Sequence, residues 1–167
     1  MDIVVRVEPT DAASPGVDFR WDADTDILTA TLHTGAVSEG MSGSVEVEGS
    51  DGSWVMFDVS GGRIAGIEVA VWPEVRKNPT LVAPAEIKDA KVSLPTRRSQ
   101  PGIAALEMNT RTLCEADDTE RTIHFRFGAA RPTSPVRVAR DILLEIDERS
   151  CIAGLWFLNV PPFPNET

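Results

Sequence analysis

The sequence predicts a mainly β protein, in which two duplicated antiparallel β-meander units form one sandwich or barrel-like domain with little helix. Three observations lead to this prediction. Apolar residues recur at every second position in many short segments, which is typical of strands. Turn-forming residues separate these segments at hairpin spacing, most clearly at Asp51-Gly52. Several segments also recur in the same order later in the chain, which indicates an internal repeat.

The first unit covers about residues 1–69 and shows the clearest alternation. Leu28, Ala30 and Leu32 share one face of a strand, and Val55 and Phe57 share one face of another. Hairpin connections are expected at 22–25, 49–52 and 60–62. The strands expected in this unit are 17–21, 26–32, 45–48, 55–59 and 64–69.

The second unit covers about residues 103–160 and repeats the first. Gly154 matches Gly66 in this repeat. The matched segments are 124–127 with 18–21, 142–146 with 55–59, and 152–155 with 64–67. The whole chain of 167 residues, 42% hydrophobic and 25% charged, therefore suits a single domain built from two related units.

The connection over 70–102 is rich in proline, which excludes a long central strand. Pro84 could open a short helix over 85–90, and a short edge strand over 91–94 is the alternative. The proline-rich tail at 160–164 is expected to be extended. It either lies on its own domain or serves as a peptide ligand for another.

Two motifs of the first unit resemble a family of small bacterial β proteins whose function is uncharacterised. The family pattern opens with Y-D-P-E-A-D-x-L and closes with G-R-I-x-G-I-E-I. The chain has W-D-A-D-T-D-I-L at 21–28 and G-R-I-A-G-I-E-V at 62–69. The resemblance covers about residues 19–69, with a weak repeat over 124–157 in which Trp156 stands where Glu68 would be. It implies a β architecture and no known activity.

The net charge of −10 is concentrated in the first unit. Residues 1–69 contain 13 acidic and 3 basic residues, whereas 70–167 contain 13 of each. Such a surface repels phosphate, which argues against a nucleic-acid partner. It attracts a basic protein partner, although acidic residues also serve solubility alone.

The compartment is predicted to be the cytoplasm. No apolar run approaches the roughly 20 residues that a membrane helix needs, so no membrane partner is expected. The first residues lack the basic start and apolar stretch of a signal peptide. Cys114 and Cys151 are therefore expected to be buried thiols.

Three aspartates, Asp22, Asp24 and Asp26, have the spacing of the first ligands of a calcium loop. The rest of that loop is missing, because Ile27 and His33 stand where glycine and glutamate are needed. Short aspartate side chains also accept backbone N–H groups in turns. We expect a turn without a metal, and no cofactor.

Glu68 and His124 are the weak catalytic candidates. Glu68 lies beside Gly66 in an apolar strand, where partial burial would suit acid–base chemistry. A structural ion pair of Glu68 with Arg63 or Arg20 is the favoured alternative. No nucleophile or phosphate-binding motif accompanies His124.

Large apolar side chains lie on both faces of some strands, so both faces need cover. The sister unit, the 70–102 connection or another chain could supply it. The interface candidates are Trp54, Met56, Trp156 and Leu158. We predict a non-catalytic protein that acts through binding or self-association, with a homodimer through strand 153–158. The alternatives are an acidic antitoxin or immunity-type inhibitor of a basic partner, and a small hydrolase using Glu68 and His124.

Overall fold

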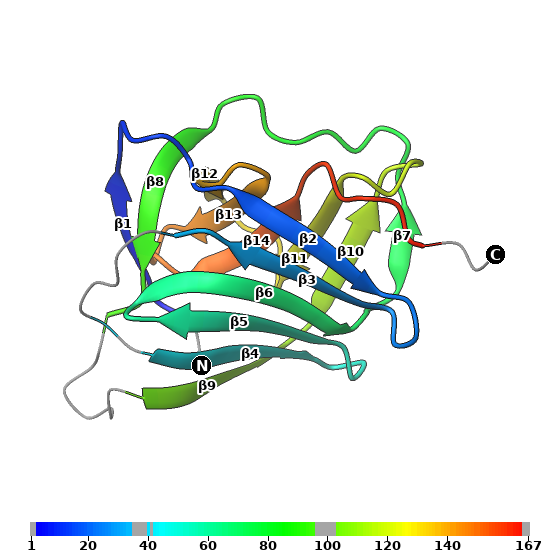
Figure 1. Ribbon diagram of the computed structural model, residues 1–167, viewed down its shortest axis with the longest axis horizontal. Helices are drawn as coiled ribbons and strands as arrows, with labels where there is room; N and C mark the ends of the chain where they lie inside the picture. Colours follow the sequence, from blue (N-terminus) through cyan, green and yellow to red (C-terminus); the bar gives the residue numbers. More distant parts are fainter. Residues whose placement is uncertain (1–2, 35–39, 41, 96–102, 165–167) are drawn as a thin grey trace.

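The computed structural model describes residues 3–34, 40, 42–95 and 103–164, and the regular structure in these residues is entirely β-strand. The strands form a strongly curled sheet whose main path makes a half-barrel (Figure 1). The predicted mainly β, barrel-like fold is confirmed. The short helix considered after Pro84 does not form, because this part of the chain enters strand β8, Lys88–Ser93.

The first half of the chain forms a five-stranded antiparallel sheet, and the predicted meander is wrong, because β3 pairs with β6 rather than with the next strand along the chain. Its strands are β2 (Val17–Asp22), β3 (Ile27–Leu32), β4 (Ser42–Gly49), β5 (Trp54–Ser60) and β6 (Arg63–Val71). They lie in the order β2-β3-β6-β5-β4. Strand β9 (Ile103–Thr110) extends this sheet by pairing in parallel with β4.

The second half has the same strand order. Its strands are β10 (Thr112–Ala116), β11 (Ile123–Phe127), β12 (Thr133–Ala139), β13 (Ile142–Asp147) and β14 (Ile152–Phe157). They lie in the order β10-β11-β14-β13-β12. Strand β7 (Val75–Lys77) pairs in parallel with β10 at one edge, and β8 pairs in parallel with β12 at the other.

The register corrects one of the segment matches made from sequence. The position of β11 corresponds to β3, whereas the 124–127 segment was matched to β2. Phe125 lies opposite Leu155 just as Ala30 lies opposite Ile67. The mismatch has a simple cause: alternating apolar and charged residues look alike in any two strands with one buried face.

The other two matches agree with the register. Asp58 lies opposite Gly66 in the first half, and Glu145 lies opposite Gly154 in the second. A β-bulge follows both carboxylates at the same place. The two halves thus share a local irregularity as well as a strand order.

Aromatic rings from both halves meet in the interior. Phe57 contacts Phe127 edge to face at 6.4 Å between ring centroids, and Phe19 contacts Phe157 at 5.6 Å. Phe57, Phe127 and Phe157 are fully buried. The inner faces of the two halves of the sheet therefore share one core.

The outer face of the second half is covered by the chain itself. Strand β7 lies at one edge of this sheet and β8 at the other, and the green segment over 78–87 links them (Figure 1). The aromatic core fills the inner face. Leu143 and Trp156, which lie on the outer face, are also buried within the chain, with only 6% of Trp156 exposed.

The proline-rich tail runs along its own domain in extended form. The Trp21 indole Nε1 donates a hydrogen bond to the Pro161 carbonyl at 2.8 Å, and Phe163 packs edge-on against Trp21. The thiols of Cys114 and Cys151 are both buried, as predicted. Burial, reinforced by the nearby Glu115 charge, raises the pKa of Cys114 to about 12.

The described strands and loops include no helix of the length and apolarity that crossing a bilayer requires.

Candidate functional site: an acidic outer face

The outward side chains of β4, β5, β6 and β9 form a face that is unusually rich in carboxylates. Glu46 lies between Glu107 of β9 and Met56 of β5, and Met56 lies opposite Glu68 of β6. Beside this row, Glu48 lies opposite Trp54. We call this surface the acidic face; it consists of Glu46, Glu48, Trp54, Met56, Asp58, Glu68 and Glu107.

The alternation of the strands directs these side chains outward. In β5 the buried residues are Val55, Phe57 and Val59, whereas Trp54 is 40% exposed and Asp58 is exposed. Because the side chains of a strand alternate between its two faces, burying the valines and phenylalanine inside places Trp54 and Asp58 outside. A cavity of about 330 Å³ lies on this face, lined by Glu46, Glu48, Gly52, Trp54 and Glu107.

None of the five carboxylates on the acidic face forms an ion pair or a side-chain hydrogen bond with another described residue. Strands β4, β5 and β9 contain no lysine or arginine. Like charges directly opposite one another across a ladder, such as Glu46 and Glu107, oppose folding. The face therefore holds a concentrated negative charge that the fold itself does not neutralise.

This arrangement is suited to binding a cationic group. Carboxylates bind lysine and arginine side chains by charge-assisted hydrogen bonds. The exposed Trp54 ring adds an aromatic face on which an ammonium or guanidinium group can rest. Among the residues described, no three His, Cys, Asp or Glu side chains converge to hold a metal ion.

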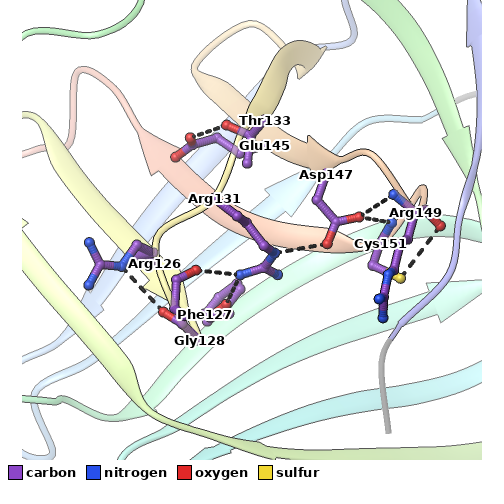
Figure 2. Close-up of polar contacts among 10 residues, drawn as sticks. Arg126, Phe127, Gly128, Arg131, Thr133, Glu145, Asp147, Arg149 and Cys151 are labelled. Atoms are coloured by element: carbon purple, nitrogen blue, oxygen red, sulfur yellow. Dashed lines mark hydrogen bonds and ion pairs between the residues drawn. The ribbon is translucent and has the colours of Figure 1, made fainter.

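His124 belongs to a separate cluster, on the outer face of the second half. Its Nε2 contacts the carboxylate of Glu145, and its ring stacks on Trp156 with 4.2 Å between centroids. Trp156 Nε1 donates to Glu145 at 3.1 Å, and Thr133 Oγ1 donates to the other carboxylate oxygen at 2.9 Å, as Figure 2 shows for Thr133 and Glu145. The side chains of His124 and Glu145 are each 18% exposed. Both oxygens of Glu145 are thus engaged by neighbours.

Charge balance in this cluster favours an ionised Glu145. Burial alone would raise the pKa of its carboxyl group. Hydrogen bonds from His124, Thr133 and Trp156, together with the charge of His124, outweigh that effect and hold the pKa below its usual value. The cluster has the properties of a structural ion pair.

Asp147 forms a second structural cluster nearby. Arg131 Nε donates to its Oδ2 at 2.9 Å, and the backbone N–H groups of Arg149 and Cys151 donate to its Oδ1 at 2.9 Å each (Figure 2). Arg131 also donates to the Phe127 carbonyl at 2.9 Å. Burial alone would raise the pKa of Asp147, but these hydrogen bonds and the Arg131 charge lower it. Asp147 therefore ties the loop after β11 to the turn after β13.

The structure does not bring the two catalytic candidates together. Glu68 lies in the first half opposite Thr29 and Met56, whereas His124 lies in the second half opposite Trp156. The expected ion pair of Glu68 with Arg63 or Arg20 is wrong, because neither arginine contacts it within ion-pair distance. Arg20 is one strand too far away, since β3 lies between β2 and β6.

The three spaced aspartates lie in the β2–β3 hairpin turn. Asp22 Oδ1 accepts a hydrogen bond from the Asp24 backbone N–H at 3.0 Å. The Asp22 carbonyl accepts one from the Asp26 N–H at 2.8 Å, and Asp26 has a φ of 61°. The carboxylate of Asp22 is thus used in shaping the turn.

The four interface candidates separate into two groups. Trp156 is buried and Leu158 is partly buried, so strand 153–158 is covered within the chain. Trp54 is exposed and Met56 is partly exposed. Sequence reasoning missed the acidic face as a unit. The alternation in Val45-Glu46-Val47-Glu48 signals half of it, but the pairing of β9 with β4 has no local signal.

Comparison with protein families and with curated proteins adds no relative: no family model matches this chain, and no curated protein matches its sequence.

Proposed function

We propose that this protein is a non-catalytic binding protein that holds a basic protein partner on its acidic face. The observation that carries this proposal is the set of five unpaired carboxylates around the exposed Trp54. Selection for stability alone would not place Glu46 directly opposite Glu107. A partner that supplies lysine or arginine side chains would neutralise this charge.

The outward side of the curled sheet is convex, which suits docking against a cleft. A basic cleft is typical of enzymes that act on nucleic acids. An inhibitor that masks such a cleft, of the antitoxin or immunity type, is the partner relationship that this face fits best. Glu68 contributes charge to this surface. The alternative of a hydrolase using Glu68 and His124 finds no support, because the two residues lie in different halves of the sheet.

The proposal can be tested with a lysine- and arginine-rich peptide as the probe in a calorimetric titration. We expect saturable binding that weakens strongly between about 0.02 M and about 0.3 M salt, because exposed charges are screened over a shorter distance at higher ionic strength. The double variant Glu46→Gln, Glu107→Gln should weaken binding about ten-fold or more.

The matched control removes two exposed carboxylates elsewhere, in the variant Glu74→Gln, Glu86→Gln. It changes the net charge by the same amount and should leave binding nearly unchanged. Equal weakening in both double variants would show a diffuse charge effect and contradict a localised site. Trp54→Ala should weaken binding further if the ring takes part.

Self-association stays a second proposal, supported by the exposure of Trp54 beside Met56. The strand 153–158 named from sequence is covered within the chain, so the acidic face is the interface candidate that remains. Two copies would bring like charges together, so a dimer through this face should strengthen as salt rises. Light scattering over a dilution series, at low and high salt, tests the homodimer. A mass near 18.1 kDa at high concentration in both salts would reject it.

A further inference from the structure

An opening lies where the two halves meet. Strand β8 pairs with β12 through Lys88 and Asp89 only, and with β6 through Ser93 only. Between these points, residues 90–92 pair with β1 (Arg6–Pro9) on their other edge. The hydrogen-bonded ladder is therefore interrupted at residues 90–92, along the edge of β8 that faces β12 and β6. A cavity of about 390 Å³ lies at this place.

The cavity is lined by buried apolar side chains and by the segment 10–15, which backbone hydrogen bonds hold in place. Leu32, Ile64 and Val92 are buried residues of its lining. The segment 10–15 forms the wall, held by a hydrogen bond from the Thr10 backbone N–H to the Asp89 carbonyl at 3.2 Å. The Arg140 N–H bonds to the Pro15 carbonyl at 2.8 Å and anchors the other end of this wall.

Two arginines, one from each half, line this cavity. Arg63 begins β6 and Arg137 lies in β12. The Nε atom of each is buried and has no hydrogen-bond partner. Neither guanidinium group forms an ion pair or a side-chain hydrogen bond with a described residue. Arg131, by contrast, uses Nε and Nη1 for three such contacts.

Buried donors are normally satisfied, because an unmatched one opposes folding. Two arginines that line one cavity each have an unmatched Nε donor, which favours an acceptor that the chain itself does not supply. The guanidinium group matches an oxyanion well, since its N–H groups form a planar fork that fits two oxygen atoms.

The remaining charges around the cavity are compatible with an anion. Lys91 and His33 also line it. Asp89 is the lining carboxylate; its Oδ1 accepts a hydrogen bond from Ser14 Oγ at 3.3 Å, and it forms no ion pair with Arg137. His33 Nε2 contacts Asp18 at 2.6 Å. The local balance is positive in a chain whose net charge is −10.

We propose that this cavity binds a small oxyanion, the phosphate or carboxylate group of a small molecule, between Arg63 and Arg137. The volume of about 390 Å³ lies within the range of small-molecule sites, about 300–1,000 Å³. Because the two arginines come from different halves, the bound anion joins β6 to β12 where the ladder is interrupted. This site is separate from the acidic face and does not depend on the function proposed for it.

The test is a thermal unfolding series with inorganic phosphate and with citrate, against sodium chloride at matched ionic strength. A ligand that binds only the folded state raises the unfolding midpoint as its concentration rises. We expect a saturable rise with phosphate, with citrate or with both, beyond that in chloride. A response to one probe alone identifies the group preferred. No rise beyond chloride with either probe would overturn the proposal.

Variants then locate the effect. Arg63→Gln and Arg137→Gln should each raise the anion concentration that gives half of the midpoint shift about ten-fold or more. Arg111→Gln, at an exposed arginine with the same charge, should leave that concentration unchanged. A response that survives in both cavity variants would place the anion elsewhere and overturn the proposal.

The substitutions Arg63→Met and Arg137→Met separate anion binding from a structural role, through the unfolding midpoint measured without anion. Methionine removes the unmatched donors while keeping much of the volume, so the unfolding midpoint without anion should not fall. The anion response should still be lost. A midpoint that falls in chloride as much as in phosphate would indicate a purely structural role and contradict the proposal.

Discussion

Glu46 lies directly opposite Glu107 in the parallel ladder between β4 and β9, and no basic side chain separates them or pairs with either. A carboxylate pair in this position raises the energy of the folded state while leaving the unfolded chain unaffected. The same pair lies at the centre of the surface proposed to bind a basic partner. Stability and binding should therefore respond to its removal in opposite directions.

We expect Glu107→Gln to stabilise the isolated protein by about 0.2–1 kcal/mol, the scale of cross-strand pair effects. Urea unfolding measures this change. The gain should shrink as salt rises, because the repulsion is screened. Glu86→Gln, at an exposed carboxylate of the connection, should be close to neutral. A loss of stability in Glu107→Gln would mean that Glu107 has a favourable contact, contrary to this account.

The duplicated glycines offer a matched comparison. A Cβ added at Gly154 would lie 2.7 Å from Glu145 Oε1 and 2.9 Å from the Phe125 carbonyl oxygen. A Cβ at the corresponding Gly66 would lie 3.4 Å from the Ala30 carbonyl oxygen, an ordinary contact. Gly154→Ala should therefore cost about 1–3 kcal/mol, the range for overpacking, and Gly66→Ala should change stability by less than about 1 kcal/mol.

Chemical denaturation of both variants measures the difference. Similar losses at the two positions would show that the close approach of Glu145 to Gly154 does not determine the cost. The Glu145→Ala background separates the two contacts at Gly154, since it removes the carboxylate while the Phe125 carbonyl oxygen remains.

Stability should fall in acid through the clusters of Glu145 and Asp147. Both carboxyl groups have pKa values below their ordinary values of 4.5 and 3.8 in the folded state. A carboxyl group whose pKa is lowered by folding contributes stability that is fully present above its unfolded pKa. This contribution is lost as the pH falls from that value through the lower folded pKa.

The free energy of unfolding, measured from neutral pH to about pH 3, should therefore decline below about pH 4.5. Asp147→Asn removes one of these groups, so it should be less stable at neutral pH and have a shallower acid decline. Asp118→Asn, at an exposed position, should keep the original profile. An unchanged profile in Asp147→Asn would contradict a stabilising role for the Arg131 contact.

The period-two pattern predicts the strands and hairpins of the first half, because burial of one sheet face selects alternate residues, but it did not reveal β7 or β12. It placed Val55, Phe57 and Val59 inside and Asp58 outside, as the structure has them. It could not identify strand partners. Phe125 was matched to Phe19 because both lie in alternating strands, and the pairing with β14 shows that it corresponds to Ala30.

The candidate sites depend on contacts that no local pattern signals. Glu107 lies opposite Glu46 because β9 pairs in parallel with β4, which is distant in the sequence. Arg63 and Arg137 line the same cavity because β8 lies between β6 and β12 in the strand order. Such relationships arise from the order of strands, which follows from packing of the whole chain rather than from neighbouring residues.

The two halves should unfold as one cooperative unit, because their inner faces share a core. Phe127 of β11 is fully buried and meets Phe57 of β5 across the interior, at 6.4 Å between ring centroids. Phe127→Ala should cost about 3–5 kcal/mol, the range for truncating a buried phenylalanine. Because the ring contacts the first half as well, the loss should appear equally in both halves. Trp54, in the first half, and Trp156, in the second, are the reporters, each studied with the other tryptophans replaced by phenylalanine. Coincident urea transitions that shift together in Phe127→Ala would support a single core. An earlier transition for Trp156 alone would show that the second half opens independently.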